Sequence, residues 1–243
     1  MTAIPRRPAL LIAGAAALIL LAAFAWTKER GQEFGPRSER PVLLLLTSLP
    51  VMFGSDLALE DAGSPLLQAL ETRYRVEAIA TSSVGELARG RLLLMAQPLA
   101  QPAENLVALD QWVRGGGRLL LLADPLLEWT DPRALGDPAR PPPMFADTGL
   151  LGHWGLALDA PERRGEIESS LAGEKAMMVS PGSLRGDCAL SADRIVARCA
   201  IGKGEAIIVA DADFLDWSRG GDGARDRRAV LAALESLESA GSN

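Results

Sequence analysis

The chain has 243 residues, of which 48% are hydrophobic, so it can bury a sizeable core in one domain. Its net charge is −6, and residues 1–26 hold two arginines and no acid, which leaves −8 on the remainder. An acidic domain without a basic stripe repels phosphate backbones, so we expect no nucleic-acid partner.

An uncharged run, residues 8–26, follows a short basic N-terminus, residues 1–7. About 20 residues cross the hydrocarbon core of a bilayer, and Trp26 stands where an interfacial aromatic belongs. The run predicts a single-pass anchor in a bacterial-type inner membrane, with residues 1–7 cytoplasmic and the rest periplasmic. A cleaved signal peptide is the alternative, because Ala23-Phe24-Ala25 fits an A-x-A cleavage pattern.

A polar tether, residues 27–40, separates the anchor from one predicted α/β domain, residues 41–238, and residues 239–243 form a tail. Residues 41–47 are almost continuously apolar, as in a strand buried on both faces of a parallel sheet. We then expect a helix at residues 64–74, followed by strands at residues 75–80 and 91–96.

The clearest unit in the chain is an amphipathic helix over residues 103–113, which ends at Gly115-Gly116-Gly117 and leads into an apolar strand, residues 118–123. Strand, helix and strand in that order predict a mostly parallel, doubly wound sheet. After this unit we expect an exposed loop at residues 131–143 and a helix at residues 145–154. Short strands are expected within residues 165–190, and two adjoining strands at residues 194–200 and 205–210. A closing helix is expected at residues 226–237.

The sequence offers few residues for catalysis by a nucleophile and a histidine. His153 is the single histidine, it lies in a predicted helix, and no G-x-S-x-G motif is present. Residues 202–204 read as a turn rather than a phosphate-binding loop, and residues 115–117 follow a helix where a dinucleotide fingerprint must follow a strand. We therefore expect no cofactor.

The two cysteines, Cys188 and Cys199, lack the spacing of a zinc site. They flank a predicted hairpin, and in an oxidising compartment they form either a disulfide or two buried reduced thiols.

Polar residues follow several of the predicted strands. Open α/β sheets bind ligands beyond the carboxyl ends of their strands, so these residues define a candidate ligand rim. Asp211 and Asp213 either bind a hard cation or cap the next short helix, and we favour capping, so no metal is predicted. The rim consists of Thr47, Ser48, Thr81, Ser82, Asp124, Asp211 and Asp213.

Residues 106–125, LVALDQWVRGGGRLLLLADP, resemble the extracytoplasmic auxiliary domain of certain ABC transport systems, including the gliding-motility-associated auxiliary component. Residues 202–215, GKGEAIIVADADFL, are similar to that family's late strand and its Asp-rich end, and residues 148–158 to its short helix before a W-G-L strand start. The resemblance implies a class I glutamine amidotransferase-like, flavodoxin-like fold. The chain lacks the nucleophile elbow and Cys-His pair of active amidotransferases, and it is shorter than the larger auxiliary proteins.

These observations predict a non-catalytic, membrane-anchored periplasmic accessory or binding module. The resemblance implies ABC permease and ATPase subunits, or a cell-envelope assembly, as partners. The alternative is an unusual or degenerate hydrolase that acts on a small or glycan substrate at the strand rim.

Overall fold

The computed structural model describes residues 39–52, 63–131, 133–134, 136–219 and 223–240. The α/β domain is a compact unit that begins at Pro41. The predicted anchor, residues 8–26, lies outside the described residues, and none of the helices within them is long and apolar enough to cross a bilayer.

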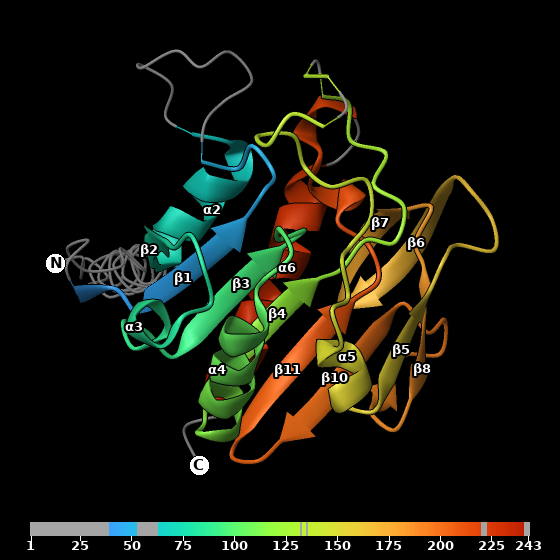
Figure 1. The fold of residues 1–243 in the computed structure, drawn as a ribbon. Helices are drawn as coiled ribbons and strands as arrows, with labels where there is room; N and C mark the ends of the chain where they lie inside the picture. Colours follow the sequence, from blue (N-terminus) through green and yellow to red (C-terminus); the bar gives the residue numbers. More distant parts are fainter. Residues whose placement is uncertain (1–38, 53–62, 132, 135, 220–222, 241–243) are drawn as a thin grey trace, which may run out of the picture. The chain divides into compact units, whose positions relative to one another are not determined.

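A seven-stranded, mostly parallel sheet forms the centre of the domain, in the order β2-β1-β3-β4-β11-β10-β9 (Figure 1). The first five strands of this order run parallel, and β10 and β9 are antiparallel to their neighbours. The predicted α/β class is therefore confirmed. The strands are β1 (Val42–Thr47), β2 (Arg75–Ala78), β3 (Leu92–Ala96), β4 (Arg118–Leu122), β9 (Ala189–Leu190), β10 (Val196–Ile201) and β11 (Gly204–Val209).

Two smaller antiparallel sheets follow β4 in the chain. The strands β5 (Leu156–Asp159) and β8 (Ser183–Gly186) pair with each other, and β6 (Glu166–Leu171) forms a hairpin with β7 (Glu174–Val179). The described part of residues 131–143 contains no helix or strand, as expected of the predicted loop.

Helices cover both faces of the large sheet. The helix predicted at residues 145–154 is much shorter than expected, because Gly149 adopts a left-handed φ of 107° and the helix begins only after it. The helices are α2 (Pro65–Arg73), α3 (Val84–Leu87), α4 (Ala103–Arg114), α5 (Leu150–His153) and α6 (Gly223–Ser239), with short 3₁₀ turns η2 (Asp213–Leu215) and η3 (Trp217–Arg219).

Successive residues of each central strand pack alternately into two hydrophobic cores, one on each face of the sheet, which explains the apolar runs in the sequence. In β1, Leu43 and Leu45 pack in the core that α2 and α6 cover, whereas Leu44 and Leu46 pack in the core that α4 covers. Because both faces are buried, the period-2 alternation of polar and apolar residues is absent from these strands.

The three glycines after α4 end that helix in a Schellman motif. Gly116 has a φ of 111°, and its N–H donates to the carbonyl of Val113 at 2.8 Å. Gly117 N–H donates to the carbonyl of Trp112 at 2.9 Å. This pattern satisfies carbonyl groups that a helix end leaves without partners, and it turns the chain into β4.

Candidate functional site

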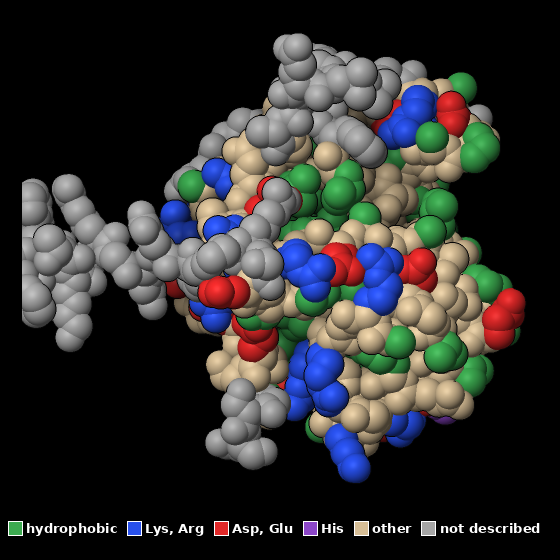
Figure 2. All heavy atoms as spheres, turned by 90° about the vertical axis from the view of Figure 1, so that its left-hand side faces the viewer, with side chains coloured by type: hydrophobic (Ala, Val, Ile, Leu, Met, Phe, Trp, Pro, Cys, Tyr) green, Lys and Arg blue, Asp and Glu red, His purple; other side chains and the backbone are tan. Residues whose placement is uncertain are grey.

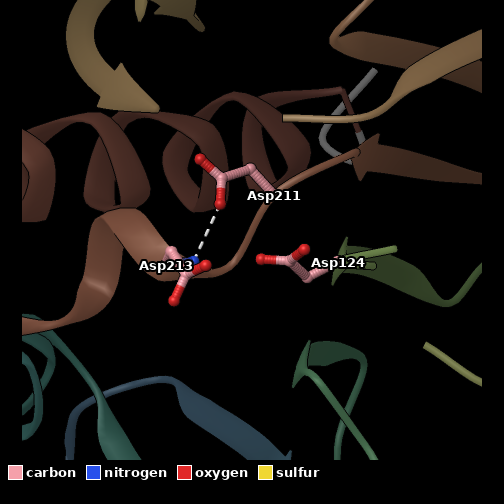
Figure 3. Close-up of side chains that lie close together, drawn as sticks. All are labelled: Asp124, Asp211 and Asp213. Carbon is pink, nitrogen blue, oxygen red and sulfur yellow. Dashed lines mark hydrogen bonds between the residues drawn. The ribbon is translucent and has the colours of Figure 1, made fainter. Parts of the chain in front are cut away.

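Three aspartates meet at the carboxyl ends of β4 and β11. Asp124 follows β4, Asp211 follows β11, and Asp213 begins η2. Figure 3 shows their side chains converging, and one carboxylate oxygen from each lies within 4.8 Å of the others. All three side chains belong to residues with no exposed surface. We call this group the carboxylate cluster.

Backbone N–H groups surround the carboxylate cluster. Asp124 accepts hydrogen bonds from the N–H groups of Leu126 (2.7 Å) and Ala212 (3.0 Å). Asp211 accepts from Val179 (2.6 Å) and from Asp213 (2.8 Å). Asp213 in turn accepts from Glu128 N–H at 2.6 Å. The cluster thus ties the ends of β4, β7 and β11 to the loops that follow β4 and β11.

The backbone N–H donors help to decide between two roles for the carboxylate cluster, namely binding a cation and capping backbone N–H groups. Five of its six carboxylate oxygens accept a backbone N–H. Calcium takes six to eight oxygen ligands, and magnesium needs near-octahedral oxygen geometry, so oxygens directed at N–H groups suit neither ion well. Asp211 bonds the N–H of the first residue of η2, although the N-cap position itself is Ala212. The geometry favours backbone capping.

Burial also shifts the protonation of two members of the carboxylate cluster. Removal from water raises the pKa of Asp124 above its usual range. The pKa of Asp211 is raised further, first by burial and then by the neighbouring charge of Asp124. Two buried carboxyl groups this close resist simultaneous ionisation, so the fold favours a proton on Asp211.

Gln97 is a buried member of the rim that sequence reasoning missed. It follows β3 with a φ of 43°, and its Oε1 accepts the N–H of Asp124 at 3.0 Å. Its Nε2 donates to the carbonyl of Pro142 at 3.1 Å and more weakly to that of Asp124. The only signal in the sequence is a polar residue directly after an apolar strand.

The predicted rim residues at the end of β1 join the same network. Thr47 Oγ1 donates to the carbonyl of Ala96 at 2.8 Å, and the Ser48 hydroxyl donates to the carbonyl of Gln97. A continuous series of hydrogen bonds therefore runs from β1 through Gln97 and Asp124 to the chain after β11. The polar groups in this series hydrogen-bond to one another and do not line an open ligand site.

The structure does not place Ser82 at this network. Ser82 follows β2, which is an edge strand three positions from β4. Its N–H donates to Gln101 Oε1 at 3.0 Å, and its hydroxyl donates to the carbonyl of Asn105 at 3.1 Å. Ser82 thus fixes the start of α4, and its inclusion with the carboxylates was wrong because strand position decides which loops meet.

A second polar pair adjoins the carboxylate cluster. Ser180, buried and with a left-handed φ of 47°, donates from its hydroxyl to Glu128 Oε1 at 2.9 Å. The same hydroxyl accepts the N–H of Gly165 at 3.0 Å. The sequence marks this serine only by the Pro-Gly that follows it.

A cavity of about 360 Å³ lies beside η2, between the first turns of α2 and α6. Phe214 and Trp217 line it together with Asp216, Asp226 and Arg227. The described residues that line it do not include any member of the carboxylate cluster. The buried carboxylates and this cavity are therefore separate features of the same rim.

His153 lies at a distance from the rim. Its ring Nε2 is 3.3 Å from Arg114 Nη2 and 3.6 Å from Asp110 Oδ1, in the last turns of α4. Because α4 leads into the start of β4, this position is toward the amino ends of the strands. The side chain is 59% exposed, which fits a surface residue.

Cys188 and Cys199 are joined by a disulfide in the structure, with 4.8 Å between their Cα atoms. Cys199 is in β10, and Cys188 precedes β9, so the bond closes the edge of the large sheet where β9 pairs with β10.

Comparisons with known proteins give a relationship of fold only. No family model and no curated protein sequence matches the chain. Among solved structures, the cytoplasmic protein STM3548 from Salmonella typhimurium is 13% identical, with a TM-score of 0.53 over 81% of this chain and 98% of that one. At this identity the likeness concerns the fold alone.

Two glycosidases are also similar in part. The exo-beta-1,4-mannosidase Op5Man5 from Opitutaceae bacterium strain TAV5 is 14% identical, with a TM-score of 0.44 over 84% of this chain and 36% of that one. A beta-galactosidase from the haloarchaeon Halorubrum lacusprofundi is 14% identical, with a TM-score of 0.48 over 82% of this chain and 30% of that one. The chain thus spans about a third of each enzyme's length, and neither likeness carries an argument about activity.

Proposed function

We propose that the chain is a non-catalytic accessory module, held in a bacterial-type inner membrane by residues 8–26 with its α/β domain in the periplasm. The observation that carries this proposal is the state of the carboxylate cluster. Its three aspartates have no exposed surface, and five of their oxygens accept backbone N–H groups. A substrate cannot reach these carboxylates without breaking the rim.

The likeness to auxiliary domains of ABC transport systems supports the choice of partner. The two stretches that carry it are residues 106–125, which form α4 and β4, and residues 202–215, which form β11 and η2. These stretches pair directly, with Leu120 opposite Ile207, and both end in the carboxylate cluster. We therefore place the domain in the class I glutamine amidotransferase-like, flavodoxin-like group and expect an ABC permease and ATPase, or a cell-envelope assembly, beside it.

The bond between Cys188 and Cys199 supports the compartment, because disulfides persist outside the reducing cytoplasm.

A hydrolase is the second candidate, and one observation favours it. Ser180 has a left-handed backbone, and its hydroxyl donates to the Glu128 carboxylate. Strained residues and hydroxyl–carboxylate pairs concentrate at active sites. Against this candidate, Ser180 has no exposed surface, and its hydroxyl also accepts the N–H of Gly165.

Substitution of the chromosomal copy separates the two candidates. An accessory module should keep its cellular function, and its crosslinks to the permease, in both Ser180→Ala and His153→Ala. Ser180→Ala should cost about 1–3 kcal/mol of stability, through its buried hydrogen bonds. Loss of function in either variant, at an unchanged amount of folded membrane protein, would reject the non-catalytic proposal. Failure to crosslink any transporter subunit in the wild type would reject the proposed partner.

A further inference from the structure

A groove of about 720 Å³ lies at the amino ends of the parallel strands, away from the carboxylate cluster. It is formed where the chain enters β1, β3 and β4, together with the β10–β11 turn and the end of α6. Four of the side chains that line it are basic, namely those of Arg89, Arg91, Arg118 and Lys203. We call it the basic groove.

The charges of the basic groove are only partly neutralised. Arg89 pairs with Glu77 and Glu86, and Arg118 lies 3.7 Å from a Glu205 oxygen. Arg91 and Lys203 are exposed, and no acidic side chain of the described residues pairs with either. Glu238 also lines the groove, but its carboxylate lies 3.5 Å from Arg73. Among the described residues, the positive charges of Arg91 and Lys203 are therefore the ones without an acidic partner.

Gly116 brings these two residues to one place. A Cβ atom at Gly116 would lie 2.6 Å from Arg91 Nη2 and 3.9 Å from the carbonyl oxygen of Lys203. Arg91 Nη2 also donates to the Gly116 carbonyl at 3.3 Å, which holds the guanidinium at the groove wall. The triple glycine thus shapes a basic recess between the end of α4 and the β10–β11 turn.

The basic groove lies where the tether joins the domain. Pro41, which joins the tether to the domain, is itself a lining residue. The tether, residues 27–40, can span at most about 50 Å. Figure 2 shows Lys and Arg side chains at several places on this face, and some of them lie low in the view, at the end of the molecule where Figure 1 shows the β10–β11 turn.

We propose that the basic groove binds the phosphate groups of anionic phospholipids and so docks the domain on the bilayer in a fixed orientation. This inference rests on the proposed function, because the anchor supplies the bilayer. Guanidinium groups suit phosphate oxygens through paired N–H donors, and a lysine adds a point charge. The chain as a whole is acidic, so a local basic recess favours an orientation in which this groove faces an anionic surface.

Lysine labelling of the full chain in vesicles tests this docking. The chain has three lysines, Lys28, Lys175 and Lys203, and Lys175 is an exposed control on β7. Vesicles of phosphatidylcholine are compared with vesicles that contain 30% phosphatidylglycerol. Acylation of Lys203, followed by mass spectrometry, should slow about fivefold in the anionic vesicles, and Lys175 should not change. Salt at 0.5 M should remove most of the protection, because it screens surface charges.

A charge variant and a soluble competitor complete the experiment. Arg91→Gln should weaken the protection of Lys203 severalfold, whereas Arg185→Gln, which changes an exposed arginine on β8, should not. Equal labelling of Lys203 in both vesicles, with the chain resistant to alkaline extraction, would overturn the docking and leave the anchor standing. Protection by sn-glycerol 3-phosphate but not by anionic vesicles would also overturn it, in favour of a soluble anion. Release of the chain by alkaline extraction would overturn both the anchor and the docking.

Discussion

Asp211 is held by opposing influences. Its two oxygens accept N–H groups from Val179 and Asp213, which favours the ionised form, while burial and the charge of Asp124 favour the protonated form. Burial is the largest of these influences, so the pKa of Asp211 lies well above its usual range. A carboxyl group of this kind stabilises the fold while it is protonated. Its contribution is complete below the unfolded pKa of about 3.9 and is lost as pH rises through the folded-state pKa.

Asp211→Asn should therefore change how stability depends on pH. The variant loses an acceptor for one N–H, at a cost of about 1–3 kcal/mol at every pH. As pH rises above the unfolded pKa of about 3.9, the free energy of unfolding of the wild type should fall relative to that of the variant, until the pH passes the folded-state pKa. Urea unfolding across this range measures the difference.

Asp159→Asn is the matched control for this titration. Its carboxylate is partly exposed, and the hydrogen bond from Arg185 lowers its pKa, so its contribution is present above the unfolded pKa and lost only as pH falls. The difference between this variant and the wild type should stay constant from pH 5 to 8. Parallel pH curves for Asp211→Asn and the wild type would contradict a buried proton on Asp211.

The Cys188–Cys199 bond should be present in the mature protein. Its sequence separation is 11, and closure of a loop of this size contributes about 2–3 kcal/mol. Protein alkylated without reduction should show no modified cysteine by mass spectrometry, and reductant should lower its stability to urea. The double variant Cys188→Ala/Cys199→Ala should not respond to reductant. Two alkylated cysteines would contradict the bond.

The sequence located the candidate rim through strand ends, because residues after parallel strands share one edge of a sheet. This reasoning included the three aspartates, which the structure brings together, and Thr47 and Ser48, which bond to the end of β3. It failed for Ser82, since nothing local in the sequence reveals that β2 is an edge strand. It also missed Gln97, whose role depends on a left-handed φ and on the loop at Pro142.

Among the elements, those with strong local signals were the predictable ones. The run that forms β1, and the helix, glycine and strand series of α4 and β4, lie within a residue or two of their predicted bounds. The β6–β7 hairpin has a weaker signal. Its two loop residues, Ala172 and Gly173, have φ values of 53° and 87°, and alanine is an unusual residue at the first of these positions. The β5–β8 pair escaped prediction because its strands are far apart in sequence.

Gly116→Ala should destabilise the turn between α4 and β4. Alanine is strained at a φ of 111°, and its Cβ would displace the Arg91 guanidinium. We expect a loss of about 1–2 kcal/mol in the free energy of unfolding. Gly152→Ala, in α5 with open space around it, is the control and should be neutral or slightly stabilising. Equal stability of the two variants would contradict a requirement for glycine at the turn.

At the scale of the whole chain, residues 8–26 should retain the protein in the membrane. An uncharged run of this length inserts as a helix, and a peripheral association would not survive high pH. Alkaline extraction of cell membranes, with N-terminal sequencing of the product, measures the outcome. Recovery of a soluble chain that begins near Trp26 would show a signal peptide in place of an anchor.

The two borders of the large sheet have a consequence for assembly. On one border β2 has only four residues, and its exposed Arg75 pairs with Glu77. On the other border β9 has only two residues. Long, apolar border strands recruit strands from other chains, whereas short and charged ones resist such recruitment. The large sheet is thereby protected against edge-to-edge pairing with the sheets of other chains.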